Sequence, residues 1–120
     1  MIRALALLAL IPGPAAAGLT CTFTQLCSPL TDCQDHPGLP FTFDLIADTL
    51  ALVTGDDTYS GVPLSHLDDA NRAFLFETSP DAFLILSLSE TGEAVMTQQD
   101  FEPGGRITSV SYFGTCRPAA

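Results

Sequence analysis

Apolar and polar residues alternate over several short stretches of the chain, as in Phe41-x-Phe43-x-Leu45 and Phe74-x-Phe76. A period of two places every second side chain on one face, which predicts half-buried β-strands. Turns rich in Gly, Pro, Asp and Ser separate these stretches from further β-branched and aromatic segments. We therefore expect eight strands, at residues 20–26, 41–46, 49–54, 58–64, 73–78, 82–89, 93–99 and 107–115.

One segment has a weak helical signal, and one strand stands out for its apolar character. Ser65 and Asp68 have the spacing of a capping box, so a short turn or helix is expected within residues 63–72. Residues 82–86 are apolar at every position, which predicts the most buried strand of the sheet. The frequent turns elsewhere leave little room for long helices.

Short connections in sequence order predict an antiparallel meander. A small sheet of this kind protects its edges by closing into a barrel or by folding into a barrel-like sandwich. With an even number of strands, the first and last run antiparallel and can pair. Cys21 begins the first strand and Cys116 ends the last, so we expect a disulfide between them and a second one between Cys27 and Cys33. The main alternative joins Cys21 to Cys33 and Cys27 to Cys116. The predicted fold class is an all-β meander stapled by disulfides.

The first 17 residues have the layout of a secretory signal peptide, with Arg3, an apolar run over residues 4–11 and a small-residue site at Ala15-x-Ala17. The run is too short to cross a bilayer as a helix, which needs ~20 residues, so no stable membrane anchor is expected. Residues 18–120 then form a single domain in the periplasm or outside the cell. In such an oxidising compartment the four cysteines favour disulfides over a metal site, since their spacing is not that of zinc ligands.

The excess of acidic over basic residues limits the kinds of partner that the protein can bind. The chain has 14 Asp and Glu against four Lys and Arg, and all four cations are Arg. Loss of residues 1–17 removes Arg3, so three cations against 14 acids leave a net charge of −11. This surplus excludes a nucleic-acid-binding footprint and attracts cationic partners. We expect a non-enzymatic binding or inhibitory module for a basic protein or peptide, with contacts at Asp56, Asp57, Asp68 and Asp69.

Candidate catalytic chemistry is sparse. His36 and His66 are the only histidines, and neither falls in a recognisable catalytic motif. A small periplasmic hydrolase or metal-dependent enzyme that uses one of them is the alternative function, and an envelope structural protein is a further one. No cofactor, catalytic residue or metal ligand is predicted, because the paired aspartates lack the spacing of a calcium loop. The oligomeric state and the contents of the barrel interior stay open.

The whole mature chain resembles known small secreted proteins. With residues 19–23, the evenly spaced Cys27 and Cys33, and the terminal residues 112–116, the chain resembles small secreted Gram-negative proteins of unknown function. In size, export, strand number and cysteine use it is also similar to the periplasmic inhibitors of c-type lysozyme, small β-barrels that insert a loop into a basic enzyme. The inhibitors carry an S-G-x-x-Y motif and a Thr-Lys-Gly element. This chain has only Tyr59-Ser60-Gly61, in another order, and no Lys, so their inhibitory residues do not carry over.

Overall fold

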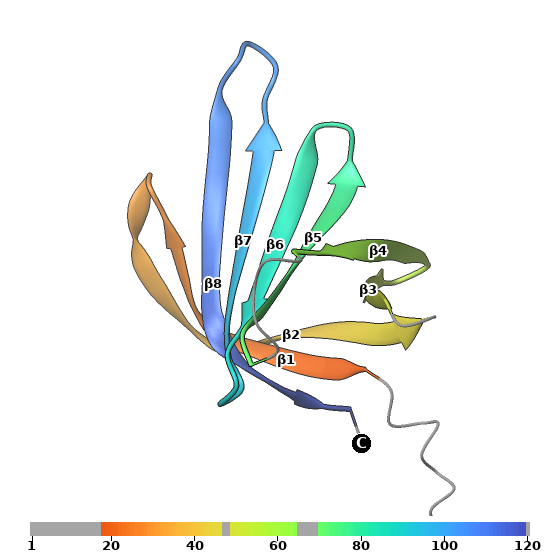
Figure 1. Ribbon diagram of the computed structural model, residues 1–120. Coiled ribbons are helices and arrows are strands. Elements are labelled where there is room, and N and C mark those ends of the chain that lie inside the picture. Colours follow the sequence, from red (N-terminus) through yellow and green to blue (C-terminus); the bar gives the residue numbers. More distant parts are fainter. Residues whose placement is uncertain (1–17, 47–48, 65–69, 120) are drawn as a thin grey trace, which may run out of the picture.

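The computed structural model describes residues 18–46, 49–64 and 70–119, which are built of strands and the turns between them. The strands are β1 (Leu19–Ser28), β2 (Thr31–Ile46), β3 (Thr49–Thr54), β4 (Asp57–Pro63), β5 (Arg72–Ser79), β6 (Ala82–Leu88), β7 (Glu93–Phe101) and β8 (Ile107–Pro118). Each strand pairs antiparallel with the next, and β8 pairs with β1, so the sheet closes into a barrel (Figure 1). The predicted all-β meander of eight strands is confirmed, and the barrel is the form that it takes.

The interior of the barrel is filled by side chains at alternating positions of the strands. The largest fully buried ones are Phe23, Phe43, Phe76, Leu52, Leu86, Met96 and Cys21. Phe43 and Phe76 come from opposite parts of the chain and their ring centroids lie 5.5 Å apart. An eight-stranded barrel has an interior just wide enough for side chains to fill. The alternation seen in the sequence therefore produces one shared core.

Gly61 on β4 gives the core the room that it needs. A Cβ atom at this position would lie 2.6 Å from the ring of Phe76 and 2.7 Å from the carbonyl oxygen of Leu50. Such distances are well inside van der Waals contact, so only glycine lets β4 pass beside the buried ring.

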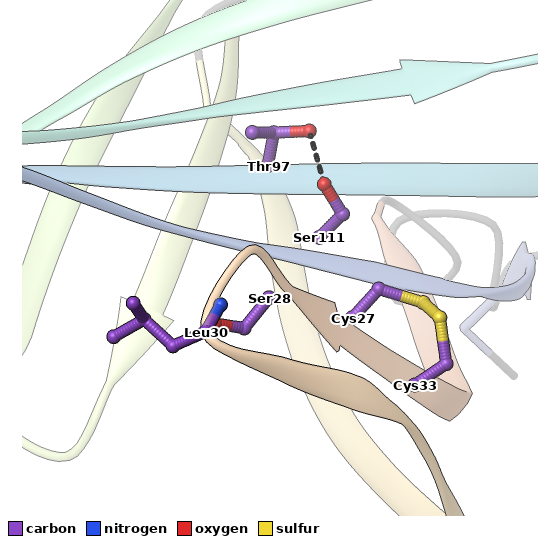
Figure 2. The surroundings of a disulfide bond; sticks show 6 residues. All are labelled: Cys27, Ser28, Leu30, Cys33, Thr97 and Ser111. Atoms are coloured by element: carbon purple, nitrogen blue, oxygen red, sulfur yellow. Dashed lines mark hydrogen bonds between the residues drawn. A yellow bond between two sulfur atoms is a disulfide. The ribbon is translucent and has the colours of Figure 1, made fainter.

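The Cys21–Cys116 disulfide closes the barrel from inside. The two residues lie directly opposite each other in the β1–β8 ladder, with Cα atoms 3.9 Å apart, and both are buried. Their bond joins residues 95 positions apart. The second disulfide, Cys27–Cys33, spans only six positions and crosses the β1–β2 hairpin just below its turn (Figure 2). Both predicted disulfide pairs are confirmed, and the alternative pairing is wrong.

β2 begins ten residues before the predicted strand, at Thr31 rather than at residue 41. The sequence signal that misled the prediction is His36-Pro37-Gly38, which is typical of a turn. Here it forms an irregularity inside a strand: the β1–β2 register shifts between Phe23 and Gln25, and the backbone N–H of Gly38 donates to Nδ1 of His36 at 2.9 Å. Proline and glycine are tolerated at such bulges, where no ladder hydrogen bond is lost.

Two further expectations concern the most buried strand, which was predicted wrongly, and the turn or helix within residues 63–72, which the structure does not test. β3, rather than β6, is the most buried strand, because its residues 50–52 are buried consecutively while Phe83 and Ile85 of β6 are only half-buried. The turn or helix expected within residues 63–72 depends on residues 65–69, which lie outside the described residues, and Pro63 and Arg72 already belong to strands. No helix long and apolar enough to span a membrane occurs in the described part of the chain.

Candidate binding surfaces at the two ends of the barrel

The direction of the strands sorts the turns into two ends. One end, which we call the hairpin end, carries the β1–β2, β3–β4, β5–β6 and β7–β8 turns. In Figure 1 the β1–β2, β5–β6 and β7–β8 hairpins extend separately from one another. The other end, which we call the pocket end, carries the β6–β7 turn, the first residues of β1 and the last of β8. In an antiparallel meander this division follows directly from strand order.

Acidic side chains gather at the hairpin end. Its four turns, with two strand residues on either side of each, contain six carboxylates and one cation, namely Asp32, Asp56, Asp57, Asp81, Asp100, Glu102 and Arg106. The same count at the pocket end, taken over the described residues alone, gives two of each, namely Glu90, Glu93, Arg72 and Arg117. Among described residues the negative charge is therefore concentrated at the hairpin end.

Of the four predicted contact residues, the structure describes two. Asp56 and Asp57 form the exposed β3–β4 turn at the hairpin end, as an accessible acidic site requires. Asp68 and Asp69, like Asp48, lie outside the described residues. The acids of the other three hairpins were not singled out from the sequence, although the alternation of turns between two ends would have pointed to them.

Exposed apolar side chains accompany the acids. Phe101 is 47% and Ile107 58% exposed, and they pair across the base of the β7–β8 turn. The ring of Phe101 lies 6.2 Å from that of Phe83 on β6, and the Phe101 N–H donates to the Asp81 carbonyl at 2.7 Å. We call Phe83, Phe101, Ile107 and the adjacent Asp81 and Glu102 the tip patch. It joins two hairpins into one apolar surface with an acidic rim.

Inside the barrel, a polar chain runs toward the same end. The Tyr112 hydroxyl donates to Oε1 of Gln98 at 3.2 Å, and Nε2 of Gln98 donates to Oδ2 of Asp100 at 3.4 Å. Partial burial, and then the negative charge of Asp100, raise the pKa of Tyr112 above its ordinary value. The Tyr112 hydroxyl therefore stays protonated at neutral pH and serves as a hydrogen-bond donor.

The pocket end holds an open cavity of about 250 Å³. Five apolar side chains from five strands line it, namely Leu19, Leu45, Leu50, Phe74 and Leu88. Gly18 and the exposed Arg72 complete the lining, and the Arg72 guanidinium carbon lies 5.3 Å from the centre of the Phe74 ring. Among the described residues, the centre of the barrel is thus filled while the pocket end has an open cavity, an arrangement that no local pattern in the sequence indicated.

The alternative enzymatic function would use His36 or His66. His36 is half-buried on β2, and within the described residues its side chain hydrogen-bonds to Gly38, a local backbone contact. His66 lies outside the described residues. A search of the described part of the chain for three or more His, Cys, Asp or Glu placed to hold a metal ion finds no such group. The alternative of a hydrolase or metal-dependent enzyme stays a prediction from the sequence.

The described residues together form a disulfide-stapled eight-stranded meander barrel with an acidic end and an apolar pocket at the other end. Comparison of the chain with family models, with curated proteins and with solved structures finds no match. The resemblance to small secreted proteins and to lysozyme inhibitors stays a prediction from the sequence. The two disulfides fit an oxidising compartment outside the cytosol.

Proposed function

We propose that this protein is a non-enzymatic binding module that uses its hairpin end to bind a basic protein or peptide. It acts in the periplasm or outside the cell, after removal of residues 1–17. The observation that carries the proposal is the coincidence, at one end of the barrel, of five exposed carboxylates with the exposed apolar tip patch. Stable interfaces combine an apolar, aromatic centre with a charged rim, and the tip patch has both parts.

The negative charge at the hairpin end is expected to raise the association rate of a basic partner more than it raises the affinity. An acidic surface steers a cationic partner toward itself and raises the association rate, an effect that falls as salt screens it. Since the Debye length is ~8 Å at physiological ionic strength, only carboxylates near the contact act strongly on a docked partner. Affinity then depends on burial of Phe101 and Ile107, which are largely exposed in the free protein.

The test measures binding of a basic probe to the secreted protein by calorimetry at low and at physiological salt. The probes are a c-type lysozyme and an amphipathic Lys/Leu peptide. The variant Asp81→Asn/Glu102→Gln removes two charges beside the tip patch, and Glu90→Gln/Glu93→Gln removes two at the pocket end as the matched control. With each exposed ion pair worth ~0.2–1 kcal/mol, we expect the first variant to weaken binding about three- to tenfold at low salt.

The control variant should change the affinity less than twofold at the same low salt. Phe101→Ala should weaken binding at both salt concentrations, because its contribution is apolar. The proposal is overturned if neither probe binds at low salt, or if the two charge variants weaken binding equally. The second outcome would mean that the partner senses only the net charge of the protein and no particular surface.

A further inference from the structure

The pocket end offers a second site that the binding of a basic partner does not use. We propose that the cavity of about 250 Å³ binds a small aliphatic monocarboxylate, with its chain among the apolar side chains and its carboxylate on Arg72. The proposal concerns the end of the barrel opposite to the hairpin end, so each site can fail without the other.

The size and lining of the cavity define the hydrocarbon part of the ligand. A dry cavity of ~150 Å³ is enough to take a benzene ring, so the larger volume here accommodates a chain of medium length but not a drug-sized molecule. Leu50 and Phe74 are buried at its floor, while Leu45 is 48% exposed at its rim. A chain that enters from the rim would cover Leu45 and displace water from an apolar surface.

The charge of the ligand follows from Arg72. The chain has four cations, all of them Arg, and among those that the structure describes Arg72 is the one that lines the cavity. Its contact with the Phe74 ring holds the guanidinium beside the apolar surface, which is the position needed to meet a carboxylate at the head of an inserted chain. A guanidinium matches a carboxylate with two parallel hydrogen bonds, so an anion is favoured over an alcohol or an amine.

Processing of the chain strengthens the same preference. Gly18 also lines the cavity. Its carbonyl oxygen accepts a hydrogen bond from the N–H of Ala119 at 3.2 Å, which holds the backbone just before β1 in place. Removal of residues 1–17 leaves a new α-ammonium group at Gly18, so a second positive charge joins Arg72 at the lining. This step rests on the export included in the proposed function, whereas the contribution of Arg72 does not.

The acidic groups that the structure describes near this end lie outside the cavity. Glu93 shares with Arg72 the lining of a neighbouring depression, and Glu90 and Asp44 are exposed on the same half of the barrel. None of these three lines the cavity itself. The acids of the hairpin end lie at the far end of the strands, where salt screens their repulsion of a ligand at Arg72.

The test titrates octanoate, 1-octanol and octylamine into the secreted protein, whose first residue is established by mass spectrometry. We expect saturable binding of octanoate, with weaker binding of octanol and weakest of octylamine. Arg72→Gln should weaken octanoate about tenfold or more, the equivalent of a lost charge-assisted hydrogen bond, and leave octanol within twofold. Arg117→Gln removes an exposed Arg of the same end that does not line the cavity, and should change octanoate binding less than twofold.

A second variant tests the cavity independently of charge. Leu45→Trp fills the rim at an already exposed position, so the barrel should fold as before while both octanoate and octanol lose binding. The proposal is overturned if octanoate does not bind saturably, if octanol binds as tightly as octanoate, or if Arg72→Gln and Arg117→Gln have equal effects. Loss of octanoate binding with lysozyme binding intact would refute this inference and leave the proposed function standing.

Discussion

The two ends of this barrel are built from the same strands but are held in different ways. Toward the pocket end, the interior is apolar and is closed by the buried Cys21–Cys116 bond. Toward the hairpin end, the interior becomes polar around Tyr112 and Gln98, and the disulfide there joins the half-buried Cys27 to the exposed Cys33. The comparison separates an end whose buried interior supports the fold from an end that exposes more of its side chains to solvent.

The difference matters because the domain is small. A chain of roughly 100 residues buries only a little over 60% of its unfolded surface and keeps a thin margin of stability. In the chain-entropy model a closure across 95 positions is worth about 4–5 kcal/mol, against about 2 kcal/mol for one across six. We therefore expect stability to depend far more on the seam between β1 and β8 than on the hairpin end.

The largest effect is expected at the seam. Replacing both partners, Cys21→Ala with Cys116→Ala, should lower the free energy of unfolding by about 4–5 kcal/mol, because the loop closure is lost from the unfolded chain. Urea denaturation monitored by circular dichroism measures the change. A loss no greater than that caused by removing the other disulfide would show that the seam bond is dispensable.

The next effect compares two phenylalanines. Phe76→Ala empties the centre of the core and should cost about 3–5 kcal/mol, while Phe101→Ala at the exposed tip patch should cost less than about 1 kcal/mol. Thermal and urea unfolding of the two variants give both values. Equal destabilisation would contradict the division between the buried core and the exposed tip patch.

A smaller effect is expected for the hairpin disulfide. Cys27→Ala with Cys33→Ala should lower the stability by about 2 kcal/mol or less, and the barrel should keep its strand content at room temperature. The variant also serves as the matched control for the seam. Unfolding of this double variant under native conditions would mean that the barrel depends on the β1–β2 hairpin for its stability.

The smallest effect concerns the inner polar chain. Tyr112→Phe removes one hydrogen bond and should cost about 1 kcal/mol at neutral pH. Because the folded-state pKa of Tyr112 is raised, its stabilising contribution is complete below its unfolded pKa of 10.0 and is lost as the pH rises through the folded value. Unfolding measured from pH 8 to pH 11 should show a steeper alkaline loss in the wild type than in Tyr112→Phe, and parallel curves would contradict this.

Local alternation and topology predicted most of the fold. Pairs such as Phe41 with Phe43 and Phe74 with Phe76 mark the inward face of a strand without reference to the rest of the chain. An even number of strands in a meander then brings Cys21 to Cys116, which is why a long-range bond could be predicted from the sequence. The first half of β2 was missed because a Pro-Gly pair inside a strand looks like a turn, and only the register with β1 distinguishes the two.

The candidate sites were harder to predict for a physical reason. The cavity at the pocket end is lined by residues from five strands and by Gly18, which share no motif and meet only when the barrel closes. Arg72 gave no signal in the sequence, since one exposed Arg beside a strand is ordinary. The exposure of Asp56 and Asp57 was predictable, whereas the pairing of Phe101 with Ile107 depends on the β7–β8 register.

Mapping the disulfides of the non-reduced protein tests the closed barrel most directly. Cleavage after Phe23 or Leu26 separates Cys21 from Cys27, and cleavage before Asp32 separates Cys27 from Cys33, so mass spectrometry can identify each bonded pair of peptides. The expected result is one species that joins Cys21 to Cys116 and another that joins Cys27 to Cys33. A species that joins Cys21 to Cys33, or free thiols at Cys21 and Cys116, would contradict the seam on which the barrel depends.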